Sequence, residues 1–397
     1  MYTLRTVSEF HYWQFITELP DISFQQTPEW NRARNGTWRP ELVGWYDQAE
    51  NLVSACAIRY GKLPGINRHF AFIPHGPLVD WQSPDLRGQL QALVEYLAQQ
   101  NVFGIRIAPF VSLNRWNAAT VKAALADTAA TSFSDIEPDF TNPRGDHLVT
   151  SLRRSGWHES PQDKATEESQ PRFNFWLDLD GKTEDDILAG MHKTWRYNAR
   201  KAIRDGVEVG LATMNDLTDF HCLYQETAER NGFDSQPISF FATIWNTMGD
   251  DFPGHFSTHL ARYDGEIIAA STTAQVNSYA QCIFTATSMS KPKVKPSNAV
   301  YMAIIREAIA RGATTYDLGG VKDTVDKSHP AAGLIRFKTE MGADAHEYVG
   351  SWDLAIEPRL YSAFTKLLPA YSRASSWLRG TVAGIGSVRD RRMKSHP

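Results

Sequence analysis

The sequence has few cysteines, and they lie far apart. Cys56, Cys222 and Cys282 form no CxxC pair, and their odd number provides no disulfide framework. The twelve histidines include no HExxH motif, and no GxSxG motif is present. A zinc centre and a covalent acyl-enzyme nucleophile are therefore both disfavoured. We expect no metal and no cofactor.

Long apolar runs and an excess of positive charge are absent as well. No stretch approaches the roughly 18 apolar residues of a membrane-spanning helix, and the start, MYTLRTVSEFHYW, does not look like a signal peptide. With 41 Lys+Arg against 45 Asp+Glu, the net charge of −4 argues against a polycation that coats nucleic acid, although it allows a local basic face. These features predict a cytoplasmic protein, with peripheral contact at the inner face of the membrane left open.

The chain is long enough for two or three compact units. It has 397 residues, of which 42% are hydrophobic, and domains average about 150 residues. Residues 41–79 alternate like strands, residues 86–100 form an amphipathic helical pattern and residues 103–109 read as a buried strand. A helix over 298–311 and a strand over 313–321 repeat this order. We interpret the halves as diverged copies in an α/β (α+β) fold.

Proline, serine and acidic residues concentrate at 135–170, where we place the interdomain connection. The expected units are 1–160, 161–350 and a C-terminal segment, 351–397. The tail is predicted to form a packing helix, with membrane-surface contact as the alternative. Its apolar face comprises Leu360, Phe364, Leu367, Leu368 and Tyr371.

In the second unit, the pattern predicts a basic helix over 184–205 and two helices over 217–248. A hairpin is expected to turn at Asp264-Gly265. Residues 333–354 read as a strand pair punctuated by glycines, with Phe337 and Lys338 at its start.

The basic helix has arginines at four-residue intervals, with two lysines nearby, beside Trp195 and Tyr197. Arginine forks suit phosphate oxygens and aromatic rings can stack on bases, so this face is a candidate for nucleic-acid binding. An ordinary solvated face is the alternative. The cationic residues are Lys193, Arg196, Arg200, Lys201 and Arg204.

Two further residues are candidates for catalysis. Asp317 ends a strand that enters Gly319-Gly320, a segment without dinucleotide or P-loop spacing, and it could cap a turn or act as a base. The Lys338 ammonium could stabilise an oxyanion while Phe337 holds a substrate; the alternative is a surface lysine beside a core phenylalanine. Without a nucleophile, such an enzyme would align two substrates for direct transfer.

Five segments together resemble the FemABX family, nonribosomal peptidyltransferases that use aminoacyl-tRNA to build peptidoglycan cross-bridges. The resemblance spans nearly the whole chain. It implies two N-acetyltransferase-like (GNAT-like) domains packed across a cleft, with the C-terminal segment returning to the first. Since 217–252 shows no sustained heptads, we expect no coiled-coil arm. The segments are QQTPEW with Arg34, FIPHGPLVDW, TWRYNARKAIRDGVEV, TAERNGF, and NAVYMAIIREAIARGATTYDLGGV with LIRFKTEMGADAHEYVG.

The resemblance also implies site residues. Arg34 stands where the family usually has a lysine that contacts precursor phosphates, and Phe337 with Lys338 matches the family's pair near the reacting centre. Phe110 is placed with the substrate-binding residues. Four positions depart from the family pattern and put the acceptor in doubt. They are Gln236 in place of a diphosphate-binding arginine, Phe240 and Thr285 in place of tyrosines, and His75 in place of an arginine.

The leading hypothesis is transfer of an amino acid from aminoacyl-tRNA to an amine of a peptidoglycan stem peptide. The precursor would be lipid-linked or UDP-linked. Lys338 would stabilise the oxyanion, Arg34 would anchor phosphate and the 193–204 face would bind tRNA, while the base is left open between Asp317, Asp323 and the leaving ribose. The alternatives are an acyl-CoA-dependent N-acyltransferase, against which no RxxGxG/A loop is found, and a noncatalytic binding homologue.

Overall fold

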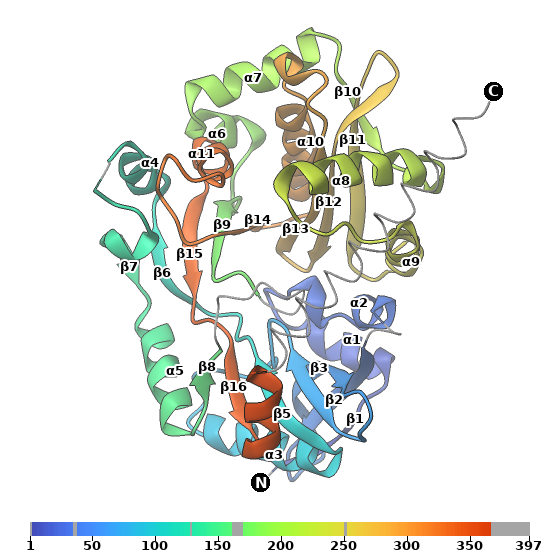
Figure 1. Cartoon of the computed structure of the whole chain (residues 1–397), viewed down its shortest axis with the longest axis vertical. Coiled ribbons are helices and arrows are strands. Elements are labelled where there is room, and N and C mark those ends of the chain that lie inside the picture. Colours follow the sequence, from blue (N-terminus) through green and yellow to red (C-terminus); the bar gives the residue numbers. More distant parts are fainter. Residues whose placement is uncertain (1, 35–37, 128, 161–169, 250–251, 367–397) are drawn as a thin grey trace, which may run out of the picture.

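The computed structural model describes residues 2–34, 38–127, 129–160, 170–249 and 252–366 (Figure 1). The chain forms two mixed sheets, one of seven strands and one of nine. The seven-stranded sheet occupies the lower half of Figure 1 and the nine-stranded sheet the upper half. In the described part of the chain, no helix has both the length and the apolar character to cross a membrane.

The first sheet is mostly antiparallel. Strands β4 and β5 run parallel because helix α3 (Leu86–Gln99) carries the chain back between them. The helix buries leucines at helical spacing against the sheet, together with helix α5 (Pro143–Arg154). The strands, in spatial order, are β1 (Thr3–Thr6), β2 (Arg39–Tyr46), β3 (Leu52–Lys62), β4 (His69–Ile73), β5 (Val102–Ile107), β16 (Trp352–Ala355) and β8 (His158–Glu159).

The second sheet repeats this plan. Strands β13 and β14 run parallel and are joined by helix α10 (Pro296–Ala310), so both sheets contain the order of helix and strand expected from the sequence. The predicted hairpin turn is present, with positive φ at Asp264 and Gly265. The strands are β10 (Glu208–Leu211), β11 (His255–Tyr263), β12 (Glu266–Val276), β13 (Tyr279–Thr287), β14 (Thr315–Val321), β9 (Phe173–Asp178), β15 (Asp344–Tyr348), β6 (Ser112–Trp116) and β7 (Phe140–Thr141).

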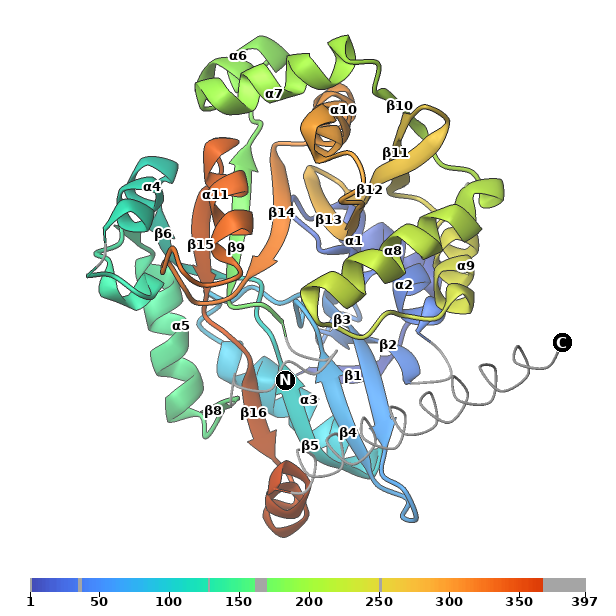
Figure 2. The ribbon, with the colours of Figure 1, turned by 45° about the horizontal axis from the view of Figure 1, so that its top comes forward.

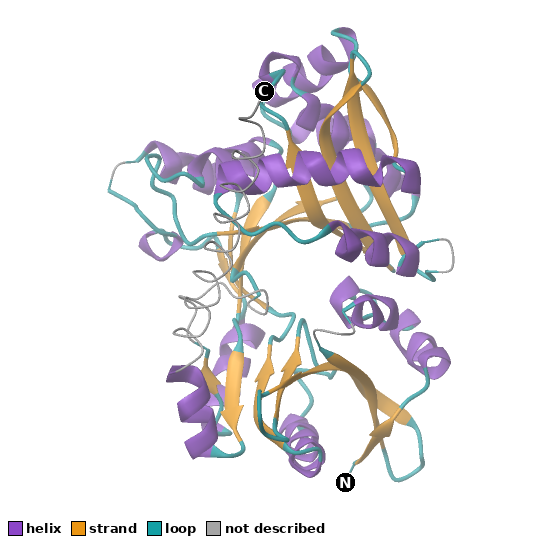
Figure 3. Ribbon diagram, turned by 45° about the vertical axis from the view of Figure 1, so that its right-hand side comes forward, coloured by secondary structure: helices purple, strands orange, loops and turns teal. Residues whose placement is uncertain are grey.

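Helices form the remaining layers. One apolar cluster joins helices of both units between the two sheets (Figure 3): α1 (Glu9–Thr17), α2 (Pro28–Ala33), α8 (Leu217–Asn231) and α9 (Ile238–Thr247). Another cluster packs α4 (Ala118–Ala126), α6 (Glu184–Gly190), α7 (Lys193–Arg204), α10 and α11 (Ala332–Glu340) with strands of the second sheet. Helices α6 and α7, at the top of Figure 2, pack against α10. Short 3-10 turns are η1 (Phe24–Gln26), η2 (Phe133–Asp135), η3 (Met214–Asp216) and η4 (Pro292–Val294).

The two sheets exchange strands along the sequence. β6 and β7 lie before residue 160 but pair into the second sheet, whereas β16 follows β15 and pairs with β5 of the first sheet. The expected division at 160 therefore does not coincide with the sheets. The predicted connection over 135–170 contains β7, α5 and β8. The chain passes between the two halves through short extended segments, visible in Figure 1 where β15 leads into β16.

Two expected elements differ from the structure. The basic helix is two helices, because Met191 and His192 adopt extended backbone angles between α6 and α7. Phe337 and Lys338 lie on helix α11, not at the start of a strand. The glycines of this segment mark the end of that helix at Gly342 and the passage between β15 and β16 at Gly350, both at positive φ.

The tail begins as a helix over 358–366. Its Leu360 and Phe364 pack against Phe70 and Phe103 of the first sheet, with Phe364 stacked on Phe70 at 5.1 Å. This is the packing contact expected for the apolar face. Leu367, Leu368 and Tyr371 lie outside the described residues.

Strand β16 is attached to the first sheet by a buried ion pair. Arg106 of β5 donates two hydrogen bonds to Asp353, at 2.7 and 2.8 Å, and the Tyr361 hydroxyl donates a third at 2.6 Å. Replacing Asp353 by Ala is expected to destabilise the fold by about 3 kcal/mol, because the arginine loses its buried partner. Thermal unfolding should show a lowered Tm.

The control is Glu357→Ala, which removes the partner of Arg68 in the same segment. Both side chains of that pair are 40% exposed, so its loss should cost about 1 kcal/mol or less. Equal losses in the two variants would contradict the role given to the buried pair.

Candidate active site

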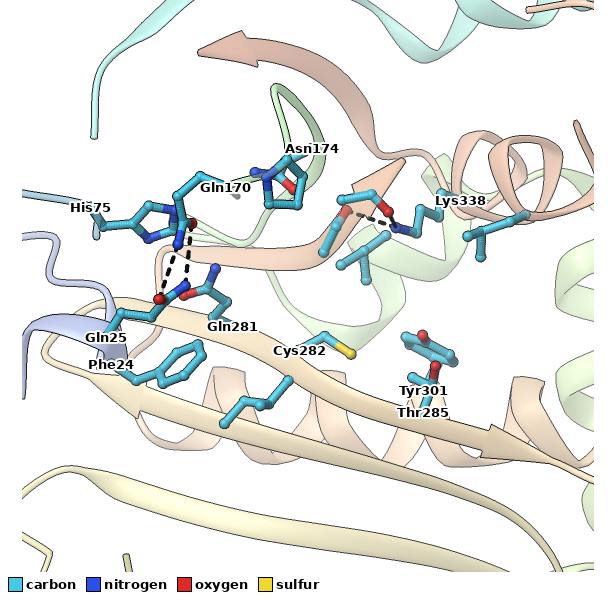
Figure 4. A pocket seen from close by; sticks show the side chains of 16 residues that line it. Phe24, Gln25, His75, Gln170, Asn174, Gln281, Cys282, Thr285, Tyr301 and Lys338 are labelled. Carbon is cyan, nitrogen blue, oxygen red and sulfur yellow. Dashed lines mark hydrogen bonds between the residues drawn. The ribbon is translucent and has the colours of Figure 1, made fainter. Parts of the chain in front are cut away.

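A cavity of about 290 Å³ lies where the two units meet (Figure 4). Its wall combines segments that are far apart in the sequence: η1, the loop after β4, β9, β13, β14, α10 and α11. Lys338 is the single charged side chain among the lining residues. These are Phe24, Gln25, His75, Gln170, Pro171, Asn174, Gln281, Cys282, Ile283, Thr285, Tyr301, Leu318, Gly319, Gly320, Leu334 and Lys338.

The Lys338 side chain is buried, with 3% of its surface exposed. Its Nζ donates to the carbonyl oxygens of Gly319 at 2.7 Å and Gly320 at 3.2 Å. Burial disfavours the charged form and lowers the pKa of Lys338 to about 8, while the Asp317 carboxylate opposes this shift. An ammonium has three N–H groups, so one remains for a ligand in the cavity. The site can therefore supply a cationic hydrogen-bond donor.

The two glycines of β14 create the acceptors for this ammonium. The ladder between β14 and β9 is interrupted between Asp317 and Gly320, and Gly319 adopts a φ of +82°. At Gly320, a Cβ atom would lie 2.3 Å from Pro171. Only residues without side chains fit this bulge, and the bulge directs successive carbonyls toward Lys338.

Asp317 is fully buried and does not line the cavity. Its carboxylate accepts hydrogen bonds from the Tyr279 hydroxyl at 2.7 Å, the Gln281 amide at 3.2 Å and the Gly319 N–H at 2.7 Å. Burial raises the pKa of Asp317. These contacts hold the glycine turn. Asp323, the other carboxylate considered as a base, lines a separate cavity and accepts from the Phe133 N–H.

Thr285 and His75, both noted as departures from the family pattern, line the cavity as well. Arg34 and Phe240 come together across the two units, with the guanidinium 5.1 Å from the ring, but neither lines it. Gln236 lies before α9, where its backbone carbonyl accepts from His221 at 3.0 Å.

Phe337 and Phe110 pack next to residues that line the cavity. Phe337 packs between Trp195 of α7 and Tyr301 of α10, at 5.8 and 5.3 Å. Phe110 follows β5, where the chain passes between the sheets, and contacts His75 at 5.0 Å. Neither ring lines the cavity.

Sequence reasoning did not select the polar end of the cavity. Gln25 and Gln170 pair through their amides at 3.0 and 3.2 Å, and Gln281 accepts from the Ser23 hydroxyl at 3.0 Å. Gln25 belongs to the QQTPEW segment, and that motif was the available signal. No sequence signal identified Gln281, because a single glutamine in a strand pattern does not reveal which face of the sheet its side chain occupies.

The five cations predicted on the basic helix have different surroundings. Arg196 turns inward and donates to the carbonyls of Leu188, Ala189 and Met191, at 3.1, 2.9 and 2.5 Å. It thereby caps the end of α6. Lys201 is ion-paired with Asp205. The side chains of Lys193, Arg200 and Arg204 are exposed.

The glycine bulge gives a direct test of the lysine site. Gly320→Ala is expected to lower Tm by several degrees and to lower the protection of Lys338 from amine-modifying reagents, because the new methyl group displaces β14 from Pro171. Gly333→Ala, in α11 itself, is the control. Nothing lies within 4 Å of a Cβ there, so helix propensity should stabilise that variant by roughly 0.5–1 kcal/mol. Equal Tm values for the two variants would contradict the role of the bulge.

Comparison with known proteins agrees with this architecture. The model of the FemAB family matches residues 6–264 and 254–368. The UDP-N-acetylmuramoylpentapeptide-lysine N(6)-alanyltransferase of Weissella viridescens is 25% identical, covering 89% of this chain and 96% of its own. The lipid II:glycine glycyltransferase of Staphylococcus saprophyticus is 19% identical, covering 91% and 94%.

Two solved structures share the fold. The crystal structure of FemX superposes with a TM-score of 0.73 at 18% identity, covering 91% of this chain and 99% of that one. A tandem GNAT protein from the clavulanic acid pathway gives 0.50 at 12% identity, covering 89% and 98%. The expected pair of GNAT-like units is confirmed, and the described residues contain no long coiled-coil arm. Because the family model matches most of the chain, the chain belongs to the FemAB family.

Proposed function

We propose that the protein is an aminoacyltransferase that moves an amino acid from aminoacyl-tRNA to an amine of a peptidoglycan precursor, lipid-linked or UDP-linked. Related proteins named as alanyl- and glycyltransferases support the reaction class. The observation that carries the proposal is the buried ammonium of Lys338 at the wall of a cavity between two GNAT-like units. Such a group is suited to amide formation without a covalent intermediate.

In the proposed reaction, the acceptor amine attacks the ester carbonyl of the donor. A C–N bond forms, the ester C–O bond breaks, and the proton lost by the amine ends on the ribose hydroxyl that leaves. The tetrahedral intermediate carries negative charge on the former carbonyl oxygen. The third N–H of Lys338 would donate to this oxyanion more strongly than to the neutral carbonyl, and this difference lowers the barrier.

The donor's RNA is proposed to bind the exposed cations of α7. This helix is joined to the helix of Lys338, since the His192 N–H donates to the Glu340 carbonyl at 2.8 Å and Trp195 contacts Phe337 at 5.8 Å. A polyanion held along α7 would therefore be positioned relative to α11. Arg34, beside Phe240, is proposed to contact acceptor phosphate.

The charge state of Lys338 predicts a pH dependence. The ammonium is present below a pKa of about 8 and lost above it. In Lys338→Arg, the guanidinium stays charged over the whole pH range. The ratio of the wild-type transfer rate to the Lys338→Arg transfer rate should therefore fall as pH rises from 7 to 9.5. Titration of the acceptor amine affects both proteins equally and cancels from this ratio. Lys338→Met should lose about 100-fold in single-turnover rate.

The control is Lys122→Met on α4, an exposed lysine, which should retain the wild-type rate and pH profile. A wild-type rate that increases with pH relative to Lys338→Arg would show that the neutral amine is the active form. Full activity in Lys338→Met would remove the lysine from the mechanism.

The RNA surface is tested by charge reversal. Arg200→Glu combined with Arg204→Glu should weaken aminoacyl-tRNA binding at least tenfold and reduce the slope of log K against log salt by about 2. The matched control, Arg87→Glu with Lys122→Glu, makes the same charge change at exposed sites elsewhere. Equal effects of both pairs would indicate nonspecific electrostatics, and stabilisation by acetyl-CoA in place of tRNA would support an acyl-CoA donor.

A further inference from the structure

The cavity contains a buried histidine whose ring has no hydrogen-bond partner among the described residues. His75 lines the cavity with 4% of its surface exposed, and neither Nδ1 nor Nε2 is paired. Leaving buried polar atoms unpaired costs about 1–3 kcal/mol each. An arrangement of this kind is expected where a ligand completes the hydrogen bonds.

The backbone at His75 is also unfavourable. The residue follows β4 with a φ of +47°, a left-handed conformation that is uncommon for residues other than glycine. Its ring is held by aromatic neighbours, with Phe110 at 5.0 Å and Tyr348 at 5.9 Å. Strain and packing together fix the imidazole at the wall of the cavity.

The imidazole is neutral. Burial, with a smaller contribution from Arg59, lowers the pKa of His75 to about 3. A neutral imidazole offers one N–H donor and one nitrogen acceptor. This pair complements an amide or a hydroxyl, which also has both functions, better than it complements a phosphate or a carboxylate.

His75 and Lys338 lie at opposite ends of the cavity. Figure 4 shows His75 with Gln25, Gln170 and Gln281 at one end and Lys338 with Tyr301 at the other. The first end is polar but uncharged, and the second is cationic. A volume of about 290 Å³ is near the lower limit of ligand cavities, so it suits a short peptide segment and not a whole precursor.

We propose that His75 is a specificity-determining residue of the acceptor subsite, where its two ring nitrogens hydrogen-bond an uncharged peptide amide of the stem peptide. This inference rests on the proposed function. It assigns the reacting amine to the Lys338 end and a neighbouring peptide bond to the His75 end. A phosphate group of the precursor would then bind outside this cavity.

The sharpest test changes the ligand. Synthetic stem peptides would carry one ester in place of each peptide bond in turn, which removes the N–H and weakens the acceptor. With the wild-type protein, one of these esters should raise KM about tenfold, the effect of losing one buried hydrogen bond, with kcat changed less. In His75→Phe, the amide peptide and the ester peptide should have the same KM.

Two variants complete the experiment. His75→Asn keeps a donor and an acceptor and tolerates the left-handed backbone, so it should restore part of the preference for the amide. His346→Phe is the control, since His346 is also a neutral histidine, stacked on Trp176 at 4.2 Å, but it is half-buried and does not line the cavity. It should keep the preference of the wild type.

The outcomes separate the two proposals. If no stem peptide accepts an amino acid from the wild-type protein, the proposed function fails. If transfer occurs and no ester differs from the amide peptide, the assignment of His75 is overturned while the function stands. Because the ester series uses wild-type protein, this result does not depend on the folding of a variant.

Discussion

The hydrogen bonds between the Lys338 ammonium and the carbonyls of β14 are the interaction on which the site depends. A buried ammonium is stable only where acceptors and a counter-charge replace water. The Gly319-Gly320 bulge supplies the acceptors, and Asp317 supplies negative charge while its carboxylate accepts the Gly319 N–H. The carboxylate is thus better explained as the support of the cation than as a base.

This support extends across the two units. Gln281 donates to Asp317 and accepts from Ser23 of the first unit, so the polar network around the lysine is completed only when the units are together. The apolar cluster that joins α1 and α2 to α8 and α9 holds them in contact. Strand exchange has the same effect, since β6 of the first unit pairs in the second sheet and β16, which follows the second unit, pairs in the first sheet. A cavity lined by both units follows from this interlocking.

Local pattern predicted much of the fold and less of the site. Apolar spacing identified α3 and α10, and the Asp264-Gly265 dipeptide identified the hairpin, because these signals depend on neighbours in sequence. Lys338, predicted as a catalytic residue, lines the cavity, but the glycines around it suggested strands where α11 forms. Arg196 was grouped with the other cations of the basic helix, because the local sequence cannot show that α6 ends within reach of its side chain. His75 was noticed as a departure from the family pattern; its burial and its unpaired nitrogens required the fold.

The distribution of charge in the cavity also bears on how an acceptor amine would lose its proton. Among the described residues, no carboxylate lines the cavity, so none of their acidic side chains is placed to act as a direct base. An incoming ammonium would meet the positive charge of Lys338 and would lose part of its hydration on entering the cavity. Both effects lower the pKa of an amine. The cation that we propose to stabilise the developing oxyanion would therefore also favour the neutral, nucleophilic form of the acceptor, and a dedicated base would not be required.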